Sequence, residues 1–427
     1  MNHSGKVDQD DIVRARNILL ASGRRTPQQE VRAYRVLAQV SPASYLPLLV
    51  QALQALSYDT SVGRPHPASL ALCEEAVAAA RAIDPAEPNR ADVLYGALTS
   101  CQRELYTVGR RAEGLAMRAE MLAIGRAQAA LSGNPAVWGL GVWATGLSEE
   151  GRYAEAADAL TELVTAILPG GPREGALAWS LLEWIAALDD AERPAEALAA
   201  FETLVDMEAA EAANRPDSVA CHLFALIGYA HLLDTHAHGE RATAVRQQAL
   251  ALLTELAATG ERRSWGSYQV SYWAVLLPFS GADSEQPTLG EPRPPSGTDL
   301  LQWSPDVRQH YFDSLRTLRE QVDVLAPRAA EDPDRHLAEL VRLHRVLTVR
   351  SAVYWEHRTH LFAERVGSLF DDGVDLARRL SEHRPAEGTP ILAKVLIDRS
   401  TFRTATGETR AALADLREAL SHLGEAD

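Results

Sequence analysis

The pentapeptide Gly109-Arg110-Arg111-Ala112-Glu113 decides the fold, because two variants of it follow at an almost constant interval. It returns 42 residues later as Gly151-Arg152-Tyr153-Ala154-Glu155, and 41 residues after that as Glu192-Arg193-Pro194-Ala195-Glu196. A fixed period of this length is typical of a solenoid, in which stacked repeats bury a continuous core. Solenoids usually present extended binding surfaces. The motif therefore predicts a binding protein and leaves its ligand open.

The sequence around the motif predicts repeats that are helical throughout. Ala, Leu, Arg and Glu fill long stretches at helical spacing, and Gly, Pro and Asn interrupt them. We expect a short helix near 10–21, a second from Thr26 onward, and then antiparallel hairpins. The predicted fold class is an all-α, right-handed α-solenoid of about eight hairpins. The hairpins pair 42–57 with 67–83, 88–106 with 111–130, 135–149 with 152–168, 172–190 with 194–213, 216–234 with 240–259, 262–279 with 306–328, 334–352 with 356–381, and 388–405 with 408–423.

Composition divides the chain into four parts. Residues 1–40 are expected to cap the array, 41–279 to form its repeats, and 306–427 to form degenerate hairpins of the same kind. The segment 280–305 carries five prolines and no periodic pattern, which predicts an exposed, flexible loop. The same segment could instead link two domains.

The charge of the chain argues against two classes of partner. The 427 residues are 46% hydrophobic and 23% charged, enough to bury a core, and the formal net charge is −16. Duplex DNA and anionic membranes would repel such a chain, so neither is expected. The stretch 148–217 holds 16 acids against four arginines. It could attract a basic peptide, or it could be a solvated face that keeps the array soluble.

The remaining composition predicts no cofactor. Cys73, Cys101 and Cys221 are far apart and lack CxxC spacing, so we expect them to be buried structural residues. The cluster of His231, His236 and His238 fits a helix C-terminal cap better than a metal site. The N-terminus has no apolar signal region and no run is long enough to span a membrane, which predicts a cytoplasmic protein of undetermined oligomeric state.

The repeat that contains the second copy of the motif resembles tetratricopeptide (TPR) repeats. It combines Trp143 and Leu147 on the first helix, Gly151 in the turn, and Ala156 and Leu160 on the second helix. Antiparallel helices approach closely only where one side chain is small, and the turn needs a residue that tolerates positive φ. The resemblance implies a scaffold that binds a protein or peptide.

A narrower resemblance concerns the segment 41–47, Ser-Pro-Ala-Ser-Tyr-Leu-Pro. It is similar to the repeat-opening segment of TPR arrays found beside signalling NTPase or caspase-like protease domains in GC-rich bacteria. The chain has no GxxxxGK[ST] motif of such an NTPase. The two resemblances together imply a stand-alone, non-catalytic interaction partner in bacterial signalling or regulation.

In TPR arrays the first helix of each hairpin lines a concave groove. Tyr and Trp side chains there offer large contact areas and favour binding hot spots. The alternative is that these aromatic residues pack between neighbouring helices, as we expect for Trp143 and Trp184. Projecting the repeat frame places on the groove side Arg103, Tyr106, Trp138, Trp179, Glu183, Asp190, His222 and Tyr229.

The stretch 335–365 is locally basic in an acidic chain. Arg342 and Arg345 share a helix face, and His357, His360 and Glu364 share a face of the next predicted helix. Facing each other, these residues could bind a phosphate or carboxylate, since arginine donates two hydrogen bonds to such groups. A ligand-sensing regulator and, less favoured, an enzyme that uses the His–Glu pair are therefore alternatives to the scaffold. A third possibility is that the basic residues bind acids within the chain itself.

Overall fold

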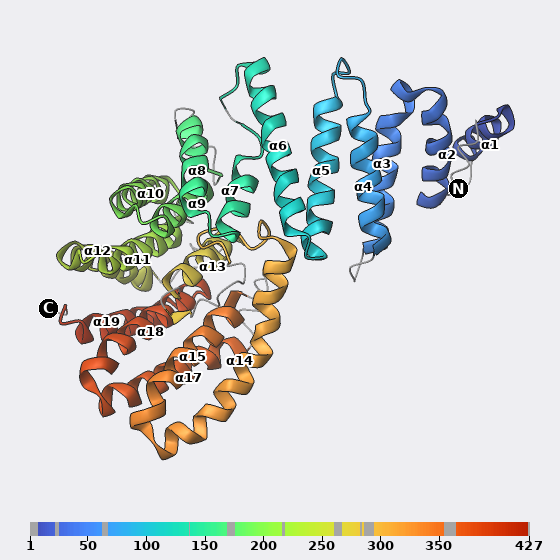
Figure 1. Cartoon of the computed structure of the whole chain (residues 1–427). Helices are drawn as coiled ribbons and strands as arrows, with labels where there is room; N and C mark the ends of the chain where they lie inside the picture. Colours follow the sequence, from blue (N-terminus) through green and yellow to red (C-terminus); the bar gives the residue numbers. More distant parts are fainter. Residues whose placement is uncertain are drawn as a thin grey trace. The chain divides into compact units, whose positions relative to one another are not determined.

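The computed structural model describes residues 7–21, 25–61, 67–135, 137–168, 176–215, 218–259, 267–281, 284–285, 294–353 and 364–425. All regular secondary structure in these ranges is helical, in eighteen helices (Figure 1). The predicted all-α fold class is confirmed. The chain forms two compact units, Met1–Leu147 with Ser304–Asp306, and Ser148–Trp303 with Val307–Asp427. None of the described helices combines the length and apolar composition needed to cross a membrane.

The first unit contains a row of helices, α1 to α6, in which each packs on the next. Thr26 begins the second helix as predicted, because its hydroxyl accepts from the Gln29 N–H while the Gln29 side chain accepts from the Thr26 N–H. The buried core runs along the row and includes Leu53, Leu98 and Cys101. The helices are α1 (Gln9–Leu20), α2 (Pro27–Val40), α3 (Pro42–Ser61), α4 (Pro67–Arg81), α5 (Arg90–Thr107), α6 (Arg111–Ser132) and most of α7 (Leu140–Glu149).

The second unit begins as the same kind of row, and its C-terminal helices then pack back onto earlier ones. Helices α8 to α12 pack in chain order, but the last helix, α19, packs on α12. Arg246 of α12 forms an ion pair with Glu425, just beyond α19, which ties the two helices together. The helices are α8 (Tyr153–Ile167), α9 (Ala176–Asp190), α10 (Pro194–Asn214), α11 (Val219–Thr235), α12 (Gly239–Thr259), α13 (Ser267–Gly281), α14 (Pro305–Glu331), α15 (Pro333–Val353), α17 (Glu364–His383), α18 (Pro385–Ala405) and α19 (Thr409–His422).

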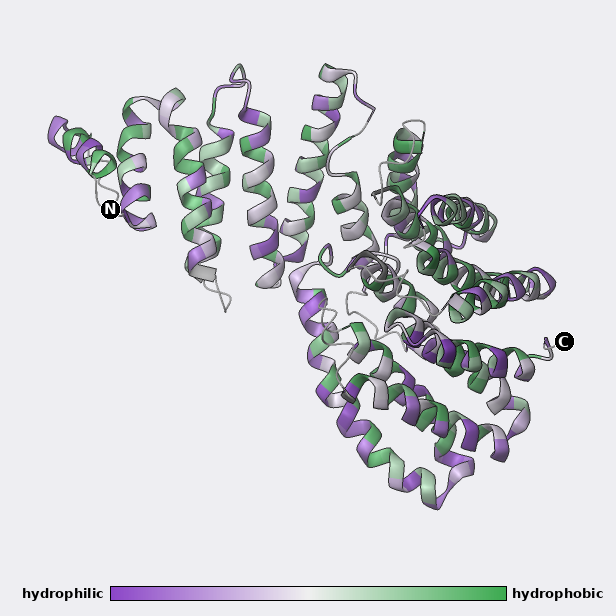
Figure 2. Cartoon of the chain, turned by 180° about the vertical axis from the view of Figure 1, so that it is seen from behind, coloured by the Kyte–Doolittle hydropathy of each residue, from purple (hydrophilic) through white to green (hydrophobic). Residues whose placement is uncertain are grey.

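Helix α13 corrects one predicted hairpin. It was expected to pair with 306–328, yet its main contacts among the described residues are with α11, α15 and α18. Helix α11 is buried on most of its surface, including Phe224 and Tyr229, so an apolar helix such as α13 can cover it. Figure 2 shows that α11 is mostly hydrophobic, whereas α14 alternates between hydrophilic and hydrophobic residues. Helix α13 therefore packs on α11 because α11 has apolar residues on several sides that must be covered.

The turn position of the motif is a residue with positive φ. Gly109 has φ 77°, Gly151 has 72°, and Glu192 has 58° although it is not a glycine. The next residue closes the preceding helix: the Arg110 N–H donates to the Leu105 carbonyl at 2.9 Å. A bond of this kind defines the Schellman ending of a helix, which requires the left-handed residue. The motif therefore recurs in the sequence because it marks the end of one helix in each repeat.

The arginine of the motif begins the following helix. Arg110, Arg152 and Arg193 are N-cap residues, and each pairs with the glutamate three residues later at 2.5–2.7 Å. Arg110 also reaches Glu74 on α4 at 2.8 Å, and Arg193 reaches Asp158 on α8 at 2.8 Å. These contacts tie the turn to the preceding hairpin and give the arginine and the glutamate of the motif a structural role.

We predict that Glu192→Gly stabilises the chain by about 1 kcal/mol, because glycine adopts positive φ without the Cβ penalty. Gly151→Ala should cost about as much, since no atom lies within 4 Å of the added Cβ and only the backbone strain changes. Urea unfolding midpoints of the two variants and the parent measure both effects. Midpoints that shift in the same direction would contradict this account of the turn.

Candidate functional site

An open groove of about 450 Å³ lies between α14, α15 and α17 in the second unit. Its floor is apolar and is formed by Val322, Leu340, Leu347, Leu369 and Leu376. Its rim carries charges of both signs, from Arg319 and Asp323 on α14 and from Asp372, Asp375 and Arg379 on α17. An apolar concavity with a few polar groups is the usual form of a binding site in a protein.

Amphipathic helices produce this groove. Leu315 and Leu318 of α14 pack with Val346 and Leu347 of α15, which anchors one side of α14. On α17, Phe370, Val374 and Ala377 are buried, while Asp372, Asp375 and Arg379 follow at helical spacing on another face. Sequence reasoning missed these three residues. The alternation of buried and charged positions on this helix was the signal that could have found them.

Most of the rim charges have no partner among the described residues. No described residue forms an ion pair or a side-chain hydrogen bond with Arg319, Asp323, Asp372 or Arg379. Only Asp375 has a partner, Arg378, at 3.6 Å. These groups are therefore available to a ligand.

His344 is a polar group in the otherwise apolar floor. Its side chain is buried, and its Nδ1 atom lies 3.4 Å from the Thr348 hydroxyl oxygen. Burial lowers the pKa of His344, and the negative charge of Asp372 opposes that effect. The imidazole is consequently neutral at neutral pH, so it can donate or accept a single hydrogen bond from inside the groove.

The predicted anion pocket around Arg342 and Arg345 is not open. Arg345 is only 8% exposed, and its Nε donates to the Asp398 carboxylate at 2.8 Å. Arg342 pairs with Glu339 at 2.7 Å and donates to the Ser284 carbonyl at 2.8 Å. Both positive charges are neutralised inside the fold, which corrects the expectation that they bind an external anion. His357, His360 and the side chain of Glu364 lie outside the described residues.

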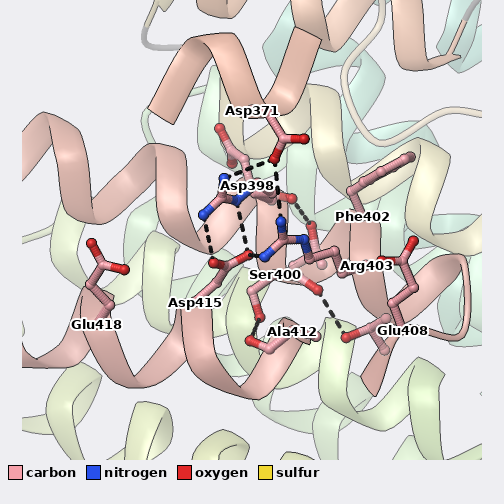
Figure 3. A network of polar contacts seen from close by, with 12 residues as sticks. Asp371, Asp398, Ser400, Phe402, Arg403, Glu408, Ala412, Asp415 and Glu418 are labelled. Atoms are coloured by element: carbon pink, nitrogen blue, oxygen red, sulfur yellow. Dashed lines mark hydrogen bonds and ion pairs between the residues drawn. The ribbon is translucent and has the colours of Figure 1, made fainter. Parts of the chain in front are cut away.

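A second ionic network, buried at Arg399 and Asp415 and exposed at Asp371, holds the last three helices together (Figure 3). Arg399 donates to Asp415 at 2.7 and 3.0 Å and to Asp371 at 2.9 Å. Arg403 bridges the same two carboxylates at 2.7 and 3.2 Å. Two positive and two negative charges balance within this set, so the network links α17, α18 and α19 and offers no free charge to a ligand.

Among the groove residues expected from the repeat frame, two aromatic side chains are buried. Tyr106 is fully buried beneath the guanidinium groups of Arg118 and Arg111, 4.5 and 5.0 Å from its ring centre. Tyr229 is 4% exposed, stacks on Phe201, and accepts a hydrogen bond from Arg241 at 2.6 Å. Neither ring is on an open surface, which corrects their assignment to the groove.

The other expected groove residues differ in exposure. In the first unit Arg103 is exposed, and Trp138 is 45% exposed with its ring edge-on to Tyr95. In the second unit Asp190 is exposed and His222 is half-buried, and burial lowers the pKa of His222. Trp179 is half-buried and lies edge-on to Tyr272 of α13, 5.9 Å between ring centres. These expected groove residues are therefore divided between the two units and differ in exposure within each.

Glu183 of α9 is a buried acid without a partner. It is 7% exposed, and no described residue forms a hydrogen bond or an ion pair with it. Burial is the main cause that raises the pKa of Glu183, and the negative charge of Asp299 adds to it, giving a pKa of about 8. The folded chain thus holds this carboxyl in its neutral form at neutral pH.

No protein-family model matches the sequence, and no curated protein sequence matches it. Two solved structures are similar to part of the chain, and both are described as "Podosopora anserina putative kinesin light chain nearly identical TPR-like repeats", the second being a point variant. Both are 16% identical to this chain, of which they cover 49%, while the chain covers 97% and 96% of them. The TM-scores are 0.39 and 0.38.

Removing one partner of the buried pair between Arg345 and Asp398 should destabilise the chain strongly. We expect Asp398→Ala to cost about 3–5 kcal/mol, because it leaves a buried positive charge uncompensated. Replacing both partners, as Arg345→Met with Asp398→Leu, should recover most of that loss. Urea unfolding of the three chains is the measurement. A double variant as unstable as Asp398→Ala would contradict a purely structural role.

Ionisation of Glu183 should weaken the fold as pH rises. Between about pH 4.5 and pH 8 the unfolded chain has released this proton while the folded chain retains it, so stability declines across that window. Glu183→Gln removes the titration. At pH 8.5 the free energy of unfolding of this variant should exceed that of the parent by at least about 1 kcal/mol, and the difference should shrink toward pH 5.

The exposed Glu320 provides the control for this titration. Glu320→Gln makes the same substitution at an exposed position and should unfold at nearly the same urea concentration as the parent. A pH-independent difference between Glu183→Gln and the parent would refute the argument from burial.

Proposed function

We propose that this chain is a non-catalytic TPR-like scaffold that binds a protein or peptide partner. The observation that carries the proposal is the groove between α14, α15 and α17, with its apolar floor and its unpaired rim charges. An apolar floor supplies contact area, and charges at the rim fix the orientation and choice of partner. A groove of about 450 Å³ has room for a few side chains, which suits a short segment of a partner.

The pattern of charge favours a peptide over a simple anion or cation. Arg319 and Arg379 are positive, whereas Asp323, Asp372 and Asp375 are negative, and both signs lie around one apolar floor. A segment with an apolar centre and charges of both signs at its ends complements this arrangement. The anion-sensing alternative loses its basis, because Arg342 and Arg345 are paired within the chain.

The proposed setting is bacterial signalling or regulation in the cytoplasm. It is supported by the similarity of the segment 41–47 to arrays that stand beside signalling domains. A scaffold acts there by holding partners through preformed surfaces, because a solenoid provides extended surfaces without a catalytic centre.

The groove can be tested with peptides selected on the purified chain from a random display library. Peptides that bind the groove should lose at least tenfold in affinity on Arg379→Glu, because a rim charge is reversed. They should bind Arg410→Glu normally, since Arg410 is an exposed arginine of α19 outside the groove. Titration by fluorescence anisotropy measures both.

The floor provides a second variant. Leu376→Gln places an amide in the partly buried floor and should weaken the same peptides by a similar factor. Selected peptides that bind all three variants as tightly as the parent would show that the groove is not the binding surface.

A further inference from the structure

The segment 294–303 covers one face of α9. It is neither helix nor strand, yet Pro295, Gly297, Leu300 and Trp303 are buried. This outcome differs from the exposed loop expected for 280–305, of which 294–303 is the main described part. The segment lies in the second unit with α9, in the region of α13 and α9 in Figure 1. A face of the repeat array is thus occupied by an extended piece of the same chain.

The fit of this segment to α9 is close in shape. Gly297 has φ 71°, and a Cβ atom on it would lie 2.5 Å from the Leu182 carbonyl oxygen and 2.7 Å from the Ala186 Cβ. Only glycine permits this approach. The Trp303 indole N–H donates to the Thr298 carbonyl at 3.0 Å, which closes the segment on itself. The contact therefore has the sterics of a peptide bound to a surface.

The fit is poor in charge. Glu183 follows Leu182 on α9, is almost fully buried, and has no partner among the described residues. The charge that acts on the Glu183 carboxyl is the carboxylate of Asp299, which the covering segment supplies and which has the same sign. A buried carboxyl without a partner costs free energy, and a like charge beside it increases that cost. Among the described residues, the segment offers the carboxyl of Glu183 no compensating positive charge.

We propose that this face of α9 is a second peptide-binding surface, and that its preferred occupant is a partner segment with glycine opposite Leu182 and lysine or arginine at the position of Asp299. The segment 294–303 occupies the surface until such a partner displaces it. A basic side chain at that position would pair with ionised Glu183, and charge-assisted hydrogen bonds are about twice as strong as neutral ones. The proposal rests on the proposed function, since it assumes that the chain binds peptide partners, but it uses a different surface.

The charge argument can be tested within the full chain by a double-variant cycle. At pH 8, Asp299→Lys should raise the melting temperature by about 2–4 °C, because the new ammonium pairs with Glu183. The rise should vanish in the Glu183→Gln background. The cycle cancels the loss of the hydrogen bond from the Leu301 N–H to the Asp299 carboxylate, since both backgrounds lose it equally. Equal shifts in the two backgrounds would overturn the proposal.

The displacement argument is tested with two synthetic peptides added to the full chain, residues 294–303 and the same peptide with Asp299→Lys. Gly297→Val in the chain should release the covering segment, because its side chain cannot fit against the Leu182 carbonyl. The substituted peptide should then bind at least tenfold tighter than the native one, and Glu183→Gln in the chain should abolish that preference. Equal affinities, or a preference that survives Glu183→Gln, would refute the surface.

Two further comparisons separate the possible failures. If Gly297→Val does not fold, the cycle of Asp299 and Glu183 decides the matter alone. Arg379→Glu should leave the affinity of both peptides unchanged, because Arg379 lines the groove between α14, α15 and α17. Failure of the selected groove peptides would therefore count against the proposed function, whereas equal binding of the two synthetic peptides would count against the α9 surface.

Discussion

Five turns between consecutive described helices depend on a residue that holds a positive φ. Without it the first helix could not end in a Schellman motif, and the second could not return antiparallel within two or three residues. Gly109, Gly151 and Gly407 meet the requirement without strain, and Glu192 meets it with strain. The arginine that follows Gly109, Gly151 and Glu192 adds a contact to the glutamate of the next helix and, at Arg110 and Arg193, to the preceding hairpin. The first residue of the motif is therefore determined by backbone geometry, and the arginine and glutamate add ion pairs to the turn.

Local signals in the sequence predicted local structure well. Thr26 with Gln29 predicts where α2 begins, because a capping box involves residues three apart. Gly109 likewise predicts where α5 ends and α6 begins, because a turn residue is adjacent in sequence to the helix ends that it joins. The place of α13 could not be predicted in this way, since it depends on which faces of α11 remain uncovered after the whole unit has packed. The contact of Arg246 with Glu425 joins residues that are 179 positions apart, and no local sequence pattern predicts it.

In the candidate site, too, the sequence predicts local features but not the contacts between distant residues. The sequence marks the stretch 335–365 as unusual, and α15 does line the groove, but through Leu340, His344 and Leu347 rather than through Arg342 and Arg345. Helical spacing says which residues share a face and not which face meets a partner within the chain. Asp398, which neutralises Arg345, lies 53 residues away. Charge counted along a sequence therefore overestimates the charge available at a surface, because distant residues pair with it.

Two buried charged residues of the second unit show how structural and functional burial differ. Arg345 has Asp398, Ser280 and Ser284 around its guanidinium group, so every donor that the fold buries there has an acceptor. Glu183 is buried to a similar degree, and the covering segment offers it only another carboxylate. An unpaired acid at a buried position costs free energy that an apolar side chain would not. On the proposal for the α9 face, a second occupant would lower that cost by supplying the missing positive charge.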